Sequence, residues 1–228
     1  MASLIHLTRQ PEQAEPGPPP LLLLLHGVGS HEGDLIQLAP NLDPRFFVVS
    51  ARAPITLAPY SYAWFHVEFT PLGPVINPGE AESSRQALLR FIDELVERYG
   101  LDPARVYVMG FSQGAIMGFS LALSRPDKLA GLVAHSGRIL PEIRPLIAPP
   151  EALRGLPVFV LHGTADAVVS YRESERMHEA LERAGRPSEL LLLEDAPHAF
   201  QANWRGEANR QANAATDTFL ERHLPGAA

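Results

Sequence analysis

The sequence contains no cysteine, and this absence narrows the chemistry open to the chain. Disulfides, thiolate metal sites and a cysteine nucleophile are all excluded. The nine histidines are scattered, and neither an H-E-x-x-H pattern nor a cluster of carboxylates accompanies them. The loop at Gly27-Val28-Gly29 continues into neither G-x-G-x-x-G nor a Walker lysine, the patterns that bind phosphate. We therefore expect no metal and no cofactor.

Long apolar runs and blocks of like charge are also missing. The run Leu21 to Leu25 is too short to cross a bilayer. The formal net charge is −7 and no basic block stands out, which disfavours a nucleic-acid or anionic-membrane partner. The first ten residues lack the basic region and long apolar run of a signal peptide. We expect a soluble, cytoplasmic protein that acts on a small molecule.

The chain reads as one α/β domain over residues 1–228. Its 228 residues, 46% of them hydrophobic, suffice for one substantial core. Expected strands alternate with expected helices, and this alternation is typical of βαβ units and a mostly parallel sheet with helices on both faces. The strands are predicted at 3–8, 21–25, 46–51, 105–109, 129–135, 157–161 and 188–193, and the helices at 34–39, 80–99, 113–123, 171–184 and 203–224.

One segment, residues 52–79, breaks this alternation. It is rich in proline, glycine and aromatic residues and shows no clear period. A long irregular segment inside a compact domain is usually functional, so we interpret it as a loop that covers the substrate. The alternative is a surface loop whose aromatic side chains fill a satellite core.

The segment from Val106 to Phe119 holds the pattern Gly110-Phe111-Ser112-Gln113-Gly114 between a predicted strand and a predicted helix. In that context G-x-S-x-G indicates a sharp turn that exposes the serine hydroxyl, and the two glycines let the strand and helix approach closely. The new helix points its positive end at the place where negative charge would develop. Ser112 is therefore the predicted nucleophile; an ordinary glycine-rich loop is the alternative.

A serine nucleophile needs a base, and the base needs an orienting carboxylate. In α/β-hydrolases the acid and then the histidine follow the serine, each after a later strand. Asp166 and His198 each lie five residues beyond a predicted strand end, at 161 and at 193. The rivals are Asp195 for the acid, and His135 and His162 for the base; we expect these histidines to brace loops.

An acyl-transfer transition state also needs N–H donors for its oxyanion. The backbone N–H of Gln113, next to the nucleophile, is one predicted donor. Val28 is the other, because Gly27 and Gly29 allow its N–H to turn inward. His26 is expected to brace the same loop.

Four motifs together give the chain a family resemblance. They are Leu25-His26-Gly27-Val28-Gly29, Gly110-Phe111-Ser112-Gln113-Gly114-Ala115, Leu161-His162-Gly163-Thr164-Ala165-Asp166-Ala167-Val168-Val169 and Pro197-His198. With them the chain resembles the phospholipase/carboxylesterase family of α/β-hydrolases, which includes acyl-protein thioesterases, from about residue 21 to residue 220.

The resemblance implies a small α/β-hydrolase with little or no cap that acts on carboxylic esters or thioesters. It assigns Ser112, Asp166 and His198 to the triad, and Val28 and Gln113 to the oxyanion hole. It also makes a homodimer plausible. The family tends to carry Trp-aromatic-Asp over the acyl pocket, where this chain has Trp64-Phe65-His66. The histidine departs from that pattern, and Trp64 and Phe65 are candidate pocket walls.

We therefore expect a serine carboxylesterase or thioesterase that forms an acyl-enzyme. Two alternatives stay open: a non-catalytic ligand-binding protein on a hydrolase scaffold, and a serine peptidase or acyltransferase that uses the same triad.

Overall fold

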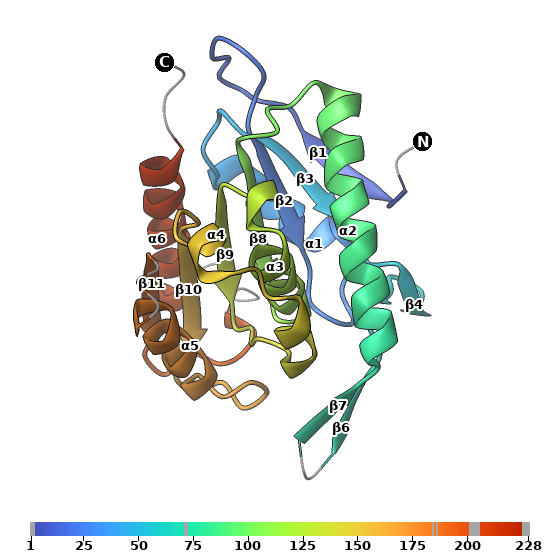
Figure 1. The fold of residues 1–228 in the computed structure, drawn as a ribbon, viewed down its shortest axis with the longest axis vertical. Coiled ribbons are helices and arrows are strands. Elements are labelled where there is room, and N and C mark those ends of the chain that lie inside the picture. The colour runs from blue at the N-terminus through green and yellow to red at the C-terminus, as the bar shows by residue number, and fades with distance from the viewer. Residues whose placement is uncertain (1–2, 71–72, 184, 186, 201–205, 225–228) are drawn as a thin grey trace.

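In the computed structural model, which describes residues 3–70, 73–183, 185, 187–200 and 206–224, a central sheet of seven strands carries helices on both faces (Figure 1). The strand order is β1-β3-β2-β8-β9-β10-β11, and every neighbouring pair is parallel except β1 with β3. The mostly parallel α/β architecture predicted from the sequence is confirmed. The strands of this sheet are β1 (His6–Arg9), β2 (Leu21–Leu25), β3 (Phe47–Ala51), β8 (Val106–Phe111), β9 (Gly131–His135), β10 (Val158–Gly163) and β11 (Ser188–Leu193).

The α-helices are α1 (Glu32–Leu35), α2 (Pro78–Tyr99), α3 (Gln113–Ser124), α4 (Pro150–Leu153), α5 (Arg172–Arg183) and α6 (Glu207–His223), and the 3₁₀ helices are η1 (Ile36–Asn41), η2 (Pro126–Lys128) and η3 (Pro141–Leu146). None of the helices in the described ranges is both long and apolar enough to cross a membrane.

The strand β2 shows how the sheet separates two cores. All five of its leucines are fully buried. Because side chains alternate along a strand, Leu21, Leu23 and Leu25 join the core that α2, α3 and α5 cover. Leu22 and Leu24 join the core beneath α6 and η1. A strand buried on both faces therefore needs an uninterrupted apolar run, which the sequence supplies.

The longest helix, α2, begins earlier than predicted. Its N-cap is Asn77, whose side-chain oxygen accepts hydrogen bonds from the N–H groups of Gly79 and Glu80, and Pro78 occupies the first turn. Proline is well tolerated there because that N–H has no helical partner. The helix ends as predicted before Gly100, which adopts the left-handed conformation at φ 63°.

The segment 52–79, predicted to be irregular, is instead built from four short strands. These are β4 (Ile55–Ala58) with β5 (Ser61–Ala63) and β6 (Val67–Thr70) with β7 (Gly73–Ile76), each an antiparallel pair. The β6–β7 pair projects below the body of the molecule in Figure 1. Apart from a bridge between Tyr62 and Ser30, these strands pair only with each other in the described part of the chain. Most of their residues are partly or fully exposed, so the sequence carries no strong apolar alternation for them.

Three smaller differences concern element ends. The first strand begins at His6 rather than residue 3, and the helix predicted at 34–39 is α1 followed by η1, which contains Pro40. The proline-rich stretch after residue 140 includes η3 and α4. Residues 203–205, predicted to start the last helix, lie outside the described residues.

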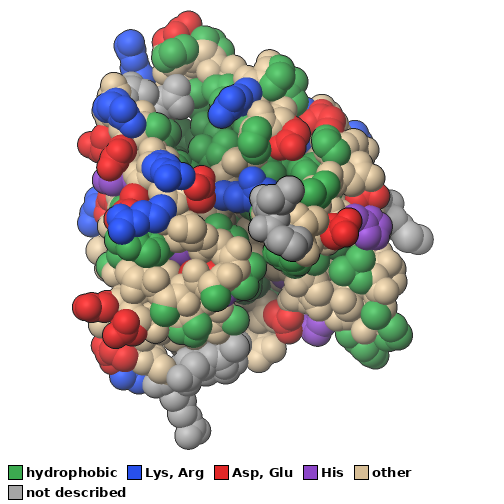
Figure 2. All heavy atoms as spheres, turned by 90° about the horizontal axis from the view of Figure 1, so that it is seen from below, with side chains coloured by type: hydrophobic (Ala, Val, Ile, Leu, Met, Phe, Trp, Pro, Cys, Tyr) green, Lys and Arg blue, Asp and Glu red, His purple; other side chains and the backbone are tan. Residues whose placement is uncertain are grey.

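The carboxyl ends of the central strands meet at one edge. Phe111 lies beside His135 and His135 beside Leu161, while Gly163 lies beside Leu193. The loops that follow β2, β8, β10 and β11 therefore start from the same edge, where open α/β sheets bind ligands. Figure 2 looks onto this edge, where hydrophobic side chains gather among basic and acidic ones.

Candidate active site

Ser112 lies in the sharp turn between β8 and α3. Its backbone has φ 52° and ψ −115°, a conformation that costs a non-glycine residue energy and is common at functional sites. A Cβ at Gly114 would lie 1.9 Å from the carbonyl oxygen of Leu25, and one at Gly110 would lie 2.4 Å from the carbonyl oxygen of Gly114. Both glycines are therefore required for the strand and helix to pack this closely.

His198 brings Ser112 and Asp166 together. Its Nε2 lies 3.0 Å from the Ser112 hydroxyl oxygen, and its Nδ1 lies 2.6 Å from Oδ2 of Asp166. A carboxylate only accepts, so Nδ1–H donates to Asp166 and Nε2 accepts the serine hydroxyl. The ring of Phe111 packs against His198 with centroids 5.2 Å apart. The arrangement can move a proton from Ser112 to His198.

Asp166 is held by four hydrogen bonds. Its Oδ2 accepts from His198 and from Nε2 of His162 at 3.0 Å, and its Oδ1 accepts from the N–H groups of Val168 and Val169 at 2.8 Å. Burial alone would raise the pKa of this carboxyl, but the donors from His162, His198 and the backbone outweigh it and hold the pKa well below its ordinary value. Asp166 therefore stays ionised beside His198.

The rival residues make other contacts. Asp195 is exposed and, within the described residues, makes no hydrogen bond to His198. His135 is buried beside Thr216 and Phe200, and its burial lowers its pKa to about 3. His162 braces the Asp166 loop, since its Nε2 also contacts the carbonyl oxygen of Val169 at 3.0 Å. The sequence did not reveal the contact of His162 with Asp166, although the four-residue spacing of the two residues was available as a signal.

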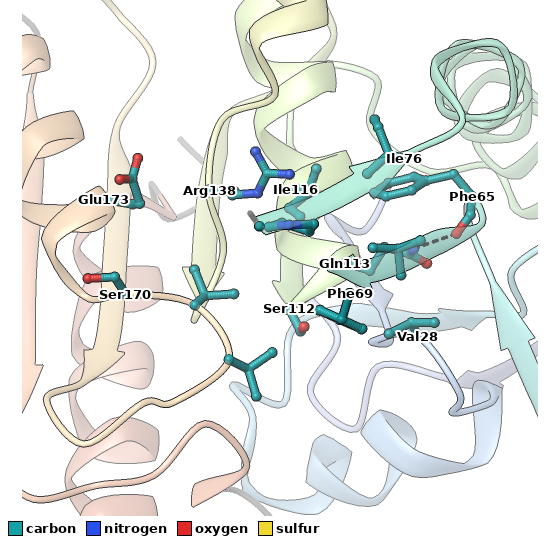
Figure 3. Close-up of a pocket in the computed structure, with 15 residues that line it drawn as sticks. Val28, Phe65, Phe69, Ile76, Ser112, Gln113, Ile116, Arg138, Ser170 and Glu173 are labelled. Carbon is teal, nitrogen blue, oxygen red and sulfur yellow. Dashed lines mark hydrogen bonds between the residues drawn. The ribbon is translucent and has the colours of Figure 1, made fainter. Parts of the chain in front are cut away.

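Val28 and Gln113, the two predicted oxyanion donors, line one cavity together with Ser112. Gln113 is the first residue of α3, where N–H groups have no partner within the helix. Among the described residues no hydrogen bond is made by the N–H of Val28. Figure 3 shows Val28, Ser112 and Gln113 around one cavity. Both predicted donors thus lie at the cavity that holds Ser112.

The Val28 loop is fixed by His26. Its Nδ1–H donates to the carbonyl oxygen of Gly27 at 2.8 Å, and its Nε2 accepts from the N–H of Ala53 at 3.1 Å. Burial lowers the pKa of His26, which keeps the ring neutral and able to accept. The indole N–H of Trp64 donates to the carbonyl oxygen of His26 at 3.0 Å. The expected bracing role of His26 follows from these contacts.

The two candidate pocket walls have different positions. Phe65 lines the cavity, whereas Trp64 is fully buried behind it and is not among the lining residues. The side chain of Gln113 holds both, accepting from the N–H of Trp64 and donating to the carbonyl oxygen of Phe65, each at 2.7 Å. His66 points away, where its ring and N–H contact Glu80 at the start of α2.

Two cavities lie at this edge of the sheet. The first, of about 360 Å³, is mostly apolar, and Ser112 and Gln113 lie in its wall. The second, of about 370 Å³, includes Phe111 and Ala199, the residues beside Ser112 and His198 in the chain. Val28 lines both. Within the described ranges no three His, Asp or Glu side chains are grouped so that they could hold a metal ion.

Comparisons with known proteins find relatives over most of the chain. The phospholipase/carboxylesterase family matches residues 10–204. The esterase YpfH of Escherichia coli K12 is 29% identical over 192 residues, which cover 79% of this chain and 76% of YpfH. Acyl-protein thioesterase 1 of Eremothecium gossypii is 31% identical over 170 residues, or 69% of this chain and 71% of that protein. The crystal structure of a Bacillus cereus carboxylesterase superposes with a TM-score of 0.79 at 25% identity, covering 97% of this chain and 95% of that one.

Proposed function

Because the chain belongs to the phospholipase/carboxylesterase family and is a serine ester hydrolase, we propose that it cleaves carboxylic esters or thioesters through an acyl-enzyme on Ser112. The observation that carries the proposal is the pair of contacts that His198 makes, 3.0 Å to Ser112 and 2.6 Å to Asp166. Base, nucleophile and orienting acid are within hydrogen-bond reach, as nucleophilic catalysis requires.

In the first half of the reaction, the Ser112 oxygen attacks the substrate carbonyl while Nε2 of His198 takes the hydroxyl proton. Asp166 holds the imidazole by Nδ1–H and stabilises the imidazolium that forms. The N–H groups of Val28 and Gln113 bind the oxyanion. The C–O or C–S bond then breaks, and His198 gives its proton to the departing alcohol or thiol.

In the second half, water attacks the acyl carbon of the Ser112 ester and His198 again takes a proton. The tetrahedral intermediate collapses, the carboxylic acid leaves, and the proton on His198 returns to Ser112. Each oxyanion donor is expected to contribute about a hundredfold to a thousandfold to the rate.

The decisive experiment compares Ser112→Ala with Ser136→Ala on an activated ester. Ser136 is a matched control, because it too is a buried serine with φ 52° at the carboxyl end of a neighbouring strand. We expect Ser112→Ala to lose activity roughly 10⁴-fold or more with its fold intact, and Ser136→Ala to retain it. Substantial hydrolysis by folded Ser112→Ala would overturn the proposal.

A fluorophosphonate probe tests the non-catalytic alternative. A serine that is activated by His198 should be labelled covalently in the wild type and in Ser136→Ala, and not in Ser112→Ala. A protein that only binds ligands on this scaffold would not be labelled at all. Parallel assays with ester, thioester and amide substrates of the same acyl group separate an esterase from a peptidase.

A further inference from the structure

One charged side chain, Arg138, lines the largely apolar first cavity and has no hydrogen-bond or ion-pair partner among the described residues. Arg138 lines this cavity together with Ile116, Val169 and Phe65, and Figure 3 shows its guanidinium beside Ile116. Arginine is half-buried here, and a guanidinium that is removed from water favours an anion that can occupy its fork of donors.

The position of Arg138 is fixed by the same turn that supports the nucleophile. The carbonyl oxygen of His135, at the end of β9, accepts the N–H of Ser112 at 2.8 Å. Gly137 then packs so tightly on α3 that an added Cβ would lie 2.6 Å from the Cβ of Ala115. Arg138 follows directly and lines the first cavity together with Ile116 of α3. The sequence contained one signal for it, a cation just after a strand end at the catalytic edge.

No carboxylate of the protein neutralises this arginine. All 26 Asp and Glu side chains belong to the described part of the chain, and none of them forms an ion pair or hydrogen bond with Arg138. The other ionisable wall residue of the cavity is Glu173, and its carboxylate is paired with Arg176 at 2.9 Å. The positive charge in the first cavity is therefore available to a ligand.

The two cavities have the positions for the two parts of an ester substrate. A leaving group must lie on the side of His198, from which it takes its proton, and the second cavity is lined by Phe111 and Ala199, which flank that histidine. The acyl chain then occupies the first cavity, with its carbonyl at Ser112. Ile116, beside Arg138, lies about 6 Å along the helix axis from Ser112, at 1.5 Å per residue. A short chain of methylene groups spans such a distance.

We propose that Arg138 binds a carboxylate at the far end of the acyl chain, so that the protein prefers esters or thioesters of dicarboxylic acids that carry one free carboxylate. The proposal rests on the proposed function, because it assigns the acyl side of the site that Ser112 serves. A guanidinium can form two parallel hydrogen bonds to a carboxylate, and this pairing would both orient the acyl chain and strengthen its binding.

The test uses ethyl hemiesters of succinic, glutaric and adipic acid. Each is paired with a neutral ester in which an isopropyl group replaces the free carboxylate, and kcat/KM is followed by proton release. The ratio of charged to neutral substrate is the readout. We expect wild type to favour the charged member at one or more chain lengths. In Arg138→Met this ratio should fall by roughly tenfold to a hundredfold, the range expected for a hydrogen bond to a charged group.

Two further variants sharpen the result. Arg138→Lys keeps the charge and loses the fork, so its ratio should lie between those of wild type and Arg138→Met. Arg172→Met removes the same charge from an exposed neighbour of Glu173 that does not line the cavity, and it should keep the wild-type ratio. A ratio that is unchanged in Arg138→Met at all three lengths, or that falls equally in Arg172→Met, would overturn the proposal.

The same measurements distinguish this inference from the proposed function. If no ester is cleaved, or if cleavage survives Ser112→Ala, the proposed function fails. If both members of each pair are cleaved by a reaction that needs Ser112, but substitution of Arg138 leaves the ratio of their kcat/KM values unchanged, only the assignment of the carboxylate site fails.

Discussion

His162 and Asp166 form a hydrogen bond of 3.0 Å between two side chains that are completely shielded from solvent. The other ring nitrogen of His162 lies 2.7 Å from the hydroxyl of Ser174 on α5. A second histidine thus holds the carboxylate that contacts His198, and it ties that carboxylate to a helix. Buried polar groups of this kind orient a neighbour only while every member has a partner.

Replacing His162 by alanine should lower kcat about tenfold to a hundredfold with little change in KM. Asp166 loses one of its four donors, so the ring of His198 is oriented less well, whereas His162 itself does not line the first cavity. Steady-state kinetics measures the two constants separately. His162→Gln, which keeps a donor, should lose less than the alanine variant.

The control for this prediction is His178→Ala. His178 also bonds a serine, Ser188, at 2.7 Å, but it lies away from Asp166. It should retain the wild-type kcat. If His162→Ala raised KM and left kcat unchanged, the positioning role would be wrong.

Trp64 and Phe65 are adjacent in sequence but should respond differently to substitution. Trp64→Phe removes the N–H that donates to the carbonyl oxygen of His26. We therefore expect kcat/KM to fall about fivefold to thirtyfold, by the same factor for every acyl-chain length. Phe65→Ala removes a ring from the wall and so enlarges the first cavity, which should shift the substrate preference toward longer acyl chains. A chain-length series of chromogenic esters measures both. A change in the acyl-chain-length preference of Trp64→Phe would mean that Trp64 contacts the acyl chain after all.

This contrast shows what the sequence could and could not predict. Ser112, Asp166 and His198 each follow an apolar run that forms a central strand, so their common edge could be predicted from strand order alone. The structure brings all three within hydrogen-bond reach of one another, Ser112 to His198 and His198 to Asp166.

The 52–79 segment offered no such guide. Its strands are short, and a shift of one residue in pairing exchanges the two faces of a strand. Whether Trp64 or Phe65 faces the cavity therefore depends on contacts with Gln113 and His26, which are distant in sequence. The isolation of Arg138 is also a property of the fold, because it depends on where every acidic side chain lies.

Gly114→Ala should destabilise the protein by more than about 3 kcal/mol, because the new Cβ would lie 1.9 Å from a backbone oxygen that cannot move aside. Gly155→Ala is the matched control, since nothing lies within 4 Å of a Cβ added there. Urea unfolding should show a near-neutral effect for Gly155→Ala. Equal stability of the two variants would contradict the close packing of the elbow.

Asp217 on α6 should make the protein less stable as the pH rises. Burial, and then the nearby charges of Glu221 and Asp43, raise its pKa from 3.8 to about 6. The folded state therefore disfavours the ionised carboxylate, which the unfolded chain accepts freely. Its contribution to the free energy of unfolding is highest below about pH 4, falls as the pH rises to about 6, and then levels off. At 1.4 kcal/mol for each pKa unit, the loss is at most about 3 kcal/mol.

Asp217→Asn should remove this loss, because the amide is neutral at every pH. We expect the free energy of unfolding to rise by about 1–3 kcal/mol at pH 8 and to change little at pH 4. Asp127→Asn is a control in which the effect has the opposite sign. Arg125 lowers the pKa of Asp127, so the charge of Asp127 stabilises the folded state above about pH 4. The free energy of unfolding of this variant should therefore not rise at pH 8. Urea unfolding at the two pH values measures both variants. A gain for Asp217→Asn that is equal at pH 4 and pH 8 would mean that the side chain packs poorly in either charge state, and that its ionisation is not the cause.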